Sequence, residues 1–514
     1  MSKTIIIIGA GLAGLSAALQ AAENGCNVKL VSSLPSERAQ SVMAEGGINA
    51  ALNTKDENDS PEEHFTDTIK AACGLADPNA VWGMTQAAPE LVHWLLKLGV
   101  KFNMSGYDDV DLRNFGGQKK KRTAFAQSDT GKQIMTAMID AVRRKEASGM
   151  VERFSHHSFL TLRLCGNICC GCVIRDEYSQ EIVELPGNAV IVASGGMHGL
   201  FGNTTGSLSN TGEVTAELFR LGVPLVNGEM IQYHPTTVEC GGKRMLISEA
   251  ARGEGGRLFA LRNNQPWYFM EEKYPELGNL MPRDITAREI WKVSHESEVF
   301  LDMTEISKEV ISNKLSGLAD DCMTYLHKDI RKEPVPVLPV IHYFMGGILV
   351  DEQHRTSIQN LYAAGECCAQ YHGANRLGGN SLLGALYGGR VAAKSACEQA
   401  DGVVLSCATQ IDIPPASQIS EIKQLNKVMQ ETMGVVRNEN TLLNGIQTVQ
   451  ALTGNLPLLG MAVLKSALAR KESRGAHWRE DYPKSNDDDY LKTTVARFDG
   501  KQIQISFVPV PERR

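Results

Sequence analysis

The 514-residue sequence has no apolar run of membrane-spanning length and no block of basic residues. The first absence argues against a chain that spans a bilayer itself. The second, together with a net charge of −7, argues against nucleic acid as a partner. The apolar segment IIIIGAG begins at Ile5 and leaves no room for a signal peptide, so we expect a cytoplasmic protein.

The 12 cysteines do not form a pattern that completes a metal site. Four of them cluster in LCGNICCGCVI, as Cys165, Cys169, Cys170 and Cys172. A metal site there is one interpretation, but no second cysteine pair or histidine supplies a tetrahedral set. We favour the alternative, a β-hairpin that turns at Gly166-Asn167 with small thiols packed on its strands, and we predict no metal.

The N-terminal segment KTIIIIGAGLAGLSAALQ indicates a buried strand, a tight turn and a helix. Gly9, Gly11 and Gly14 form G-x-G-x-x-G at that turn, where glycines let the backbone approach a pyrophosphate and let the helix pack on the sheet. The helix N-terminus then faces the phosphates. The segment therefore predicts dinucleotide binding. Ser32 and Ser33 stand where an acidic residue often binds the ribose, which argues against NAD.

Two further buried strands end in small residues, in NAVIVASGG at 188–196 and NLYAAGECC at 360–368. The segment 236–341 lacks such a strand and ends in the stiff EPVPVLPV, which indicates an inserted domain. From about residue 412 the pattern becomes helical, and an irregular polar tail ends in the strand-like KQIQISFVPV. We predict an α/β fold with a discontinuous Rossmann-like domain, 1–235 and 342–411, and a helical C-terminal domain, 412–514.

Several short strings place polar side chains on apolar or glycine-rich backgrounds. The candidates are His234 and Thr236 in IQYHPTTVE, Ser248, Glu249 and Arg252 in MLISEAARGEGGRL, Arg283 in NLMPRDITAREI, His342 in VIHYFMGGI and Arg376 in HGANRLGGNSLL. Each has a structural alternative: a core histidine, an ion pair one turn apart, or a charged pair at a helix start. Taken together, two histidines and two arginines suit a small anion with two carboxylates. His342 and Arg376 could bind one end, and His234 and Ser248 the other.

These strings, with AEGGINAAL, NFGGQKKKRTAFAQSDTG, FGNTTG and ESRGAHWREDYP, closely resemble the flavoprotein subunits of fumarate reductase and succinate dehydrogenase. That family also includes L-aspartate oxidase, and the match runs nearly end to end. The resemblance implies a Rossmann-like FAD-binding domain interrupted by a mobile α+β capping domain, followed by the helical domain. It also implies FAD as the cofactor and a small dicarboxylate as the substrate.

By that resemblance the chain reduces fumarate to succinate, with hydride from flavin N5 and a proton from Arg283. Glu249 and Arg252 would reload the donor, and His234, Ser248, His342 and Arg376 would bind the dicarboxylate beside Phe115 and Thr236. The residues expected at FAD are Gly9, Ala10, Gly11, Gly14, Ser32, Ser41, Glu45, Gly46, Gly47, Ala193, Ser194, Gly195, Glu213, Glu366, Ser381 and Leu382. The helix that opens near Ser381 would aim its N-terminus at the flavin.

Two positions depart from relatives within the family. Gln40 stands where quinone-linked members attach FAD to a histidine, so we expect non-covalent FAD, which favours fumarate reduction or oxidation by oxygen over succinate oxidation. Phe115 stands where L-aspartate oxidases place an acid. L-aspartate oxidase, which makes iminosuccinate and hydrogen peroxide, and a succinate dehydrogenase flavoprotein subunit remain the alternatives.

The chain carries neither a ferredoxin-like cysteine set nor a haem motif. Electrons must therefore arrive through a partner, which we expect to be an iron–sulfur subunit or a soluble carrier. Such a partner could hold the chain at the inner face of the membrane.

Overall fold

The computed structural model describes residues 2–106, 109–400, 412–413 and 418–514. Its centre is a five-stranded parallel sheet with the strand order β20-β10-β1-β2-β6. The strands are β1 (Thr4–Ile8), β2 (Asn27–Ser32), β6 (Val151–Ser155), β10 (Ala189–Val192) and β20 (Leu361–Ala363). Because both faces of this sheet are covered, β1 is a continuous run of buried isoleucines rather than an alternating pattern.

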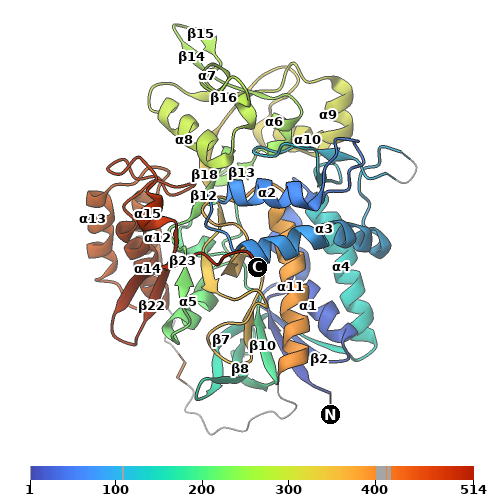
Figure 1. Ribbon diagram of the computed structural model, residues 1–514, viewed down its shortest axis with the longest axis vertical. Helices are drawn as coiled ribbons and strands as arrows, with labels where there is room; N and C mark the ends of the chain where they lie inside the picture. Colours follow the sequence, from blue (N-terminus) through green and yellow to red (C-terminus); the bar gives the residue numbers. More distant parts are fainter. Residues whose placement is uncertain (1, 107–108, 401–411, 414–417) are drawn as a thin grey trace.

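Four helices and several short strands cover one face of the parallel sheet (Figure 1). The helices are α1 (Leu12–Glu23), α3 (Pro78–Leu98), α4 (Thr130–Ala147) and α11 (Asn380–Gln399). The remaining elements of this part are α2 (Pro61–Ala71), α5 (Glu213–Arg220), β3 (Ile48–Asn49), β4 (Leu112–Arg113) and β5 (Thr123–Ala124). The predicted strand–turn–helix at the N-terminus is confirmed, and so are the two later strands of the same sheet.

A three-stranded antiparallel sheet covers the other face of the parallel sheet. It consists of β7 (His157–Cys165), β8 (Ile168–Asp176) and β9 (Ile182–Pro186). The chain turns between β7 and β8 at Gly166-Asn167, so the predicted hairpin is confirmed. Cys169 and Cys172 are buried in the core between the two sheets.

The inserted region leaves and rejoins the Rossmann-like part through two paired antiparallel strands, β12 (Ile231–Cys240) and β18 (Leu338–Phe344). Between them lie β13 (Lys243–Leu246), α6 (Glu249–Gly253), β14 (Arg257–Arg262), β15 (Gln265–Trp267), α7 (Phe269–Lys273), α8 (Arg283–Val293), β16 (Val299–Asp302), α9 (Lys308–Lys314), α10 (Ser316–Asp321) and β17 (Val335–Pro336). This region has its own hydrophobic core and forms the top of the molecule in Figure 1. An α+β capping domain is thus confirmed, and its predicted limits fall inside β12 and β18.

The C-terminal region is helical and lies beside the parallel sheet and below the capping domain (Figure 1). It contains α12 (Ile419–Thr432), α13 (Glu439–Val449), α14 (Asn455–Ala469) and the short α15 (Asp487–Tyr490). The tail that we expected to be irregular is instead a hairpin of β22 (Lys492–Phe498) and β23 (Ile503–Pro509). β22 pairs with β11 (Leu225–Val226) and joins a sheet that also holds β19 (Gly347–Leu349) and β21 (Cys368–Ala369). Val495 and Ala496 are buried in that sheet, which explains why this segment forms a regular strand.

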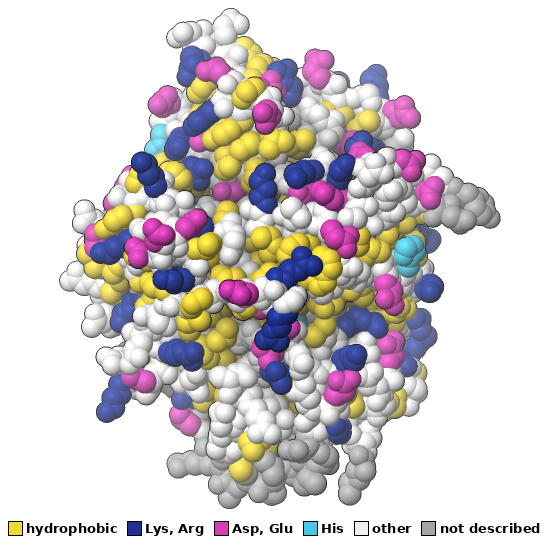
Figure 2. Space-filling view, in the orientation of Figure 1, with side chains coloured by type: hydrophobic (Ala, Val, Ile, Leu, Met, Phe, Trp, Pro, Cys, Tyr) yellow, Lys and Arg dark blue, Asp and Glu magenta, His cyan; other side chains and the backbone are white. Residues whose placement is uncertain are grey.

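On the face seen in Figure 2, basic and acidic side chains are interspersed rather than gathered by sign. Within the described ranges, no helix combines the length and the apolar character needed to cross a bilayer.

Candidate active site

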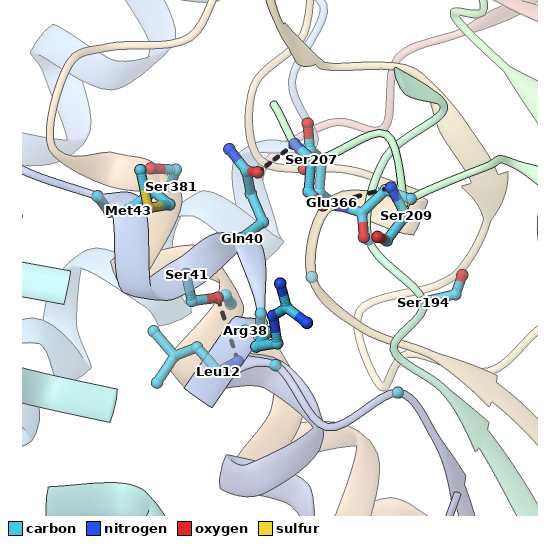
Figure 3. A pocket seen from close by; sticks show the side chains of 18 of the residues that line it. Leu12, Arg38, Gln40, Ser41, Met43, Ser194, Ser207, Ser209, Glu366 and Ser381 are labelled. Atoms are coloured by element: carbon cyan, nitrogen blue, oxygen red, sulfur yellow. Dashed lines mark hydrogen bonds between the residues drawn. The ribbon is translucent and has the colours of Figure 1, made fainter. Parts of the chain in front are cut away.

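A cavity of about 1070 Å³ lies where the carboxyl ends of β1, β2, β10 and β20 meet the capping domain. Open parallel sheets bind ligands at this edge, and the volume is at the upper end of the range for small-molecule sites. Of the residues predicted at FAD, those on the cavity wall are Gly9, Ala10, Gly11, Ser32, Ser41, Glu45, Gly46, Gly47, Ala193, Ser194, Gly195, Glu213, Glu366, Ser381 and Leu382. Figure 3 shows part of this wall.

The turn between β1 and α1 requires glycine at two positions. Gly9 has φ +109°, and a Cβ there would lie 2.2 Å from the Ala193 carbonyl oxygen. A Cβ on Gly14 would lie 1.8 Å from the Gly9 carbonyl oxygen, so Gly14 lets α1 pack against the turn rather than lining the cavity. The first turn of α1 contains no acidic residue, and Leu12 N donates to Ser41 Oγ at 3.2 Å (Figure 3). This helix N-terminus suits a phosphate anion.

A second helix N-terminus faces the same cavity. α11 starts after Gly379, which has φ +84° and whose Cβ would meet Asn49 Oδ1 at 2.1 Å. Asn49 Nδ2 donates to the Gly378 carbonyl and to Asn380 Oδ1, both at 2.7 Å, and so fixes the turn. No acid lies in the first turn of α11. Two positive helix ends on one elongated cavity fit FAD, which carries a pyrophosphate and a flavin that is anionic when reduced.

Two polar side chains on the cavity wall differ in how they are held. Gln40 Oε1 accepts a hydrogen bond from Ser207 N, so its amide is fixed at the wall (Figure 3). Glu45 is half-buried, and its buried Oε2 has no hydrogen-bond partner among the described residues. Burial and the charge of Asp321 together raise the pKa of Glu45 to about 8, against the opposing charge of Arg113.

A buried charge cluster joins the capping domain to the cavity. Glu249 Oε2 lies 2.6 Å from Arg283 Nη2, and Glu249 Oε1 lies 3.2 Å from Arg252 Nη2. Gly116 N also donates to Glu249 Oε1 at 3.0 Å. Burial alone would raise the pKa of Glu249, but the charges of Arg283 and Arg252 outweigh it and lower that pKa. Glu249 is therefore ionised between two guanidinium groups.

His234 and His342 lie side by side, with their ring centroids 5.0 Å apart. The Nδ1 of His342 is 2.7 Å from Thr205 Oγ1, and the Nδ1 of His234 is 3.1 Å from the Thr236 carbonyl oxygen. Burial, reinforced by the charge of Arg283 and other nearby cationic groups, lowers the pKa of both histidines well below its usual value. Both imidazoles are therefore neutral near pH 7.

Arg376 is buried at the cavity, and its guanidinium carbon lies 4.5 Å from the centre of the Tyr343 ring. Among the described residues no hydrogen bond or ion pair reaches its guanidinium, and its Nε is an unpartnered buried donor. Burial lowers the pKa of Arg376 to about 9, and the charge of Arg283 contributes to the shift. A charged guanidinium held in this state is a receptor for an anionic ligand such as a carboxylate.

The predicted substrate residues come together from distant segments. The cavity is lined by Phe115, His234, Ser248, Glu249, Arg283, His342 and Arg376. Arg252 lies behind Glu249 and donates to the Asn279 carbonyl. Thr236 is not on the wall: its hydroxyl donates to the Ile247 carbonyl at 2.8 Å, because a β-bulge between His234 and Thr237 breaks the alternation of β12.

The wall also holds residues that were not predicted, among them Thr205, Arg244 and Tyr343. Thr205 belongs to FGNTTG, a string that pointed to the family but not to a role. Tyr343 follows His342 on β18 and stacks against Arg376, which the sequence could not show. Arg244 lies in the β13 strand of the capping domain and has no signal in the sequence that marks it.

The sequence and the structure both match known proteins. A model of the FAD binding domain matches residues 4–382, and a model of the fumarate reductase flavoprotein C-terminus matches residues 452–513. The succinate dehydrogenase flavoprotein subunit of Bacillus subtilis is 37% identical over 100% of this chain and 98% of its own length. The 8-methylmenaquinol:fumarate reductase flavoprotein subunit of Wolinella succinogenes is 33% identical over 100% of this chain and 92% of its own.

Among solved structures, a variant of the E. coli quinol fumarate reductase chain FrdA superimposes with a TM-score of 0.89. It is 27% identical and covers 99% of this chain and 97% of its own. The likeness therefore spans the parallel sheet, the capping domain and the C-terminal region together. On this evidence the chain belongs to the family of FAD-dependent oxidoreductases formed by the succinate dehydrogenase and fumarate reductase flavoprotein subunits.

Proposed function

We propose that the chain reduces fumarate to succinate, with FAD as cofactor and electrons delivered by a partner. The observation that carries the proposal is the wall shared by the FAD site and the cluster of Arg376, His234, His342 and Arg283. A cationic, largely dry pocket of this kind suits a small diacid held next to the flavin. The relatives are named flavoprotein subunits, which supports a partner, either an iron–sulfur subunit or a soluble carrier.

The diacid is held at its two ends by different groups. Arg376 and His342 bind one carboxylate, and the fixed plane of the guanidinium sets its orientation. His234 and Ser248 bind the other carboxylate, with Phe115 packing against the substrate between them.

Each neutral imidazole carries one N–H. With Nδ1 of His234 accepting from Thr236 N at 3.3 Å and Nδ1 of His342 accepting from the Thr205 hydroxyl, both Nε2–H groups donate to the substrate, and the positive charge comes from the arginines. That charge stabilises the electron density that builds up on the substrate.

Arg283 donates the proton to the substrate carbon next to the one that receives hydride. A guanidinium is a weak acid, but the developing carbanion is a strong base and the geometry is fixed. The ionised Glu249, 2.6 Å from Arg283 Nη2, takes a proton from Arg252 and passes it to the Arg283 that has given up its own, and Arg252 is reprotonated in turn from solvent. Bound FAD supplies the two-electron chemistry of the reaction.

The FAD is held non-covalently in this proposal, because Gln40 replaces the attachment histidine and its amide cannot form that bond. A covalent link raises the flavin potential, so its absence favours reduction of fumarate over oxidation of succinate. We expect acid precipitation of the holoprotein to release all the flavin into the supernatant, measured by absorbance. Flavin retained on the precipitated chain would show that another side chain is attached to it.

The proton role of Arg283 is tested by Arg283→Lys. We expect this variant to fold and to keep its yellow colour, but to lose about 10²–10⁴-fold in fumarate reduction, the range for removal of a general acid. Anaerobic reoxidation of chemically reduced holoprotein by fumarate measures the rate. Arg262→Lys, on the capping-domain strand β14 and away from the cavity, is the matched control and should keep the parent rate. Full activity of Arg283→Lys would remove Arg283 from this role.

The same assay separates the alternative reactions. Reoxidation by fumarate but not by L-aspartate or a cinnamate-type acid supports the proposal, whereas peroxide formed with L-aspartate in air supports an L-aspartate oxidase. Succinate oxidation is the second candidate, because the Bacillus subtilis relative is named a succinate dehydrogenase subunit. Reduction of an artificial dye by succinate, faster than the reverse reaction, would favour it.

A further inference from the structure

A contact between the capping domain and the C-terminal region lies on the helix that carries Arg283. α8 begins at Arg283, and further along it the guanidinium carbon of Arg288 lies 4.0 Å from the centre of the Trp478 ring. The Nζ of Lys292 lies 5.7 Å from the same ring. Residues four apart share one face of a helix, so both cations of α8 cover one indole. Such cation–π contacts are attractive, and more so when water is excluded.

Trp478 is presented by a rigid part of the C-terminal region. Its carbonyl accepts a hydrogen bond from Arg437 N at 3.0 Å. Its neighbours His477 and Arg479 are both 0% exposed, and Arg479 pairs with Asp481 at 2.6 Å. The indole therefore stays in place if the capping domain moves.

Little space remains where the two parts meet. The crevice between them has a volume of about 10 Å³, and its walls are Tyr233, Asp284, Ala287 and Arg288 on one side and Val435, Gly475, Ala476 and Trp478 on the other. A crevice of this size holds at most one water. The contact is close-packed, and it joins α8 to a region that lies outside the capping domain (Figure 1).

The geometry couples this contact to the active site. α8 packs against β12 and β18, the strands by which the capping domain is attached. A rotation of the capping domain on those strands would withdraw Arg283 from the cavity and Arg288 from Trp478 together. We infer that Arg288 and Trp478 form a latch that holds the capping domain closed over a bound diacid and so positions Arg283. The inference rests on the proposed diacid site, and both residues are positioning residues that touch neither substrate nor flavin.

The latch is tested by the rate at which a bound diacid leaves the holoprotein, because release requires the capping domain to open. The probe is malonate, and its release after dilution is followed by flavin absorbance in stopped flow. We expect release to be about fivefold faster in Arg288→Ala and in Trp478→Ala, equivalent to about 1 kcal/mol for a cation–π contact. The double variant should be no faster than Trp478→Ala, since loss of the indole already removes its contacts with both Arg288 and Lys292.

The chain supplies a matched control for these variants. Arg262 stacks on Trp267 at 3.5 Å, but both residues lie in the hairpin of the capping domain, so Arg262→Ala should leave malonate release unchanged. Arg288→Lys keeps the cation and should stay within about twofold of the parent. Arg288→Ala removes a partly buried side chain, so a folded protein is expected even if Trp478→Ala fails to fold.

Unchanged release in Arg288→Ala, or effects that add in the double variant, would overturn the latch. Malonate release involves no proton transfer, so the latch is judged separately from the donor role of Arg283. A holoprotein that does not bind malonate at all would refute the diacid site, and the latch would be refuted with it.

Discussion

Two buried arginines show opposite ways of placing a guanidinium inside this chain. Arg470, in the C-terminal region, uses its five donors on five acceptors: Glu229, Glu472, Thr494 Oγ1 and the carbonyls of Tyr490 and Lys492, at 2.7–2.8 Å. Arg376, at the cavity, has the face of Tyr343 beside it but no hydrogen bond or ion pair within the described part of the chain. Both are buried to a similar degree.

The number of hydrogen-bond acceptors around a buried arginine indicates whether it stabilises the fold or is available to a ligand. A buried charge is costly unless it is paired, so a guanidinium with five acceptors holds its surroundings together. The same group without acceptors lowers stability and keeps its donors for a ligand. Lowering of the Arg376 pKa to about 9 reflects that cost, yet the group is still charged at pH 7. The C-terminal arginine therefore stabilises the fold, whereas we propose that the cavity arginine binds the substrate.

The largest effect is expected from Arg376→Gln. Loss of one partner of a buried charge pair with the substrate should lower kcat/KM for fumarate about 10³-fold, equivalent to about 4 kcal/mol. The free energy of unfolding should not fall, because the removed charge has no partner in the protein. Anaerobic turnover and urea unfolding of the same preparation measure the two quantities. A clear loss of stability in this variant would show that Arg376 has a structural partner.

Arg470→Gln is the matched control for that variant. Removing Arg470 leaves Glu229 buried without its cation, while Glu472 keeps Arg474, so we expect a loss of about 3–5 kcal/mol in unfolding free energy. Malonate affinity of the molecules that remain folded should stay at the parent value. If Arg470→Gln were as stable as the parent, the contrast between the two arginines would not hold.

The sequence predicted most of the fold, and most of the residues it proposed for the site lie on one cavity wall, for local reasons. A run of buried isoleucines followed by Gly9 and Gly11 fits only a strand and a tight turn, and polar residues on apolar backgrounds are visible in one dimension. The strand-like KQIQISFVPV was predicted and is β23, but β22 was not predicted, because its pairing partner, β11, lies far away in the chain. Thr236 was placed at the substrate through the string IQYHPTTVE and the family resemblance, and the bulge after His234 keeps it off the cavity wall.

The sequence could not show which charged side chains lack partners, or which residues of the capping domain contact the C-terminal region. The contact between Arg288 and Trp478 joins residues far apart in sequence, and neither belongs to a motif with a role. Arg376 lacks hydrogen-bond partners because no acceptor in the described residues lies within reach of its guanidinium. Both properties depend on the packed chain, so the proposed latch and the lack of partners at Arg376 could be found only from the structure, although Arg376 itself was predicted from the sequence.

The smallest effect on stability is expected from an acidic residue on the cavity wall, Glu45. Glu45 is half-buried on the cavity wall and forms no ion pair among the described residues, whereas Glu229 pairs with Arg470 through Oε1. Its folded pKa of about 8 lies above the ordinary value of 4.5, so its contribution is fully present below pH 4.5 and is lost as the pH rises towards 8. Over pH 6 to 7 the unfolding free energy should fall by about 1 kcal/mol from this group.

Glu45→Gln should remove that decline, because an amide does not ionise. The comparison is made by urea unfolding of flavin-free protein at pH 5.5, 6.5 and 7.5, in the parent and in the variant. The difference in stability between the two should shift in favour of the variant as the pH rises. Parallel curves for the two proteins would mean that Glu45 is already ionised, held by Arg113, and that the cavity wall stabilises a carboxylate as well as the C-terminal network does.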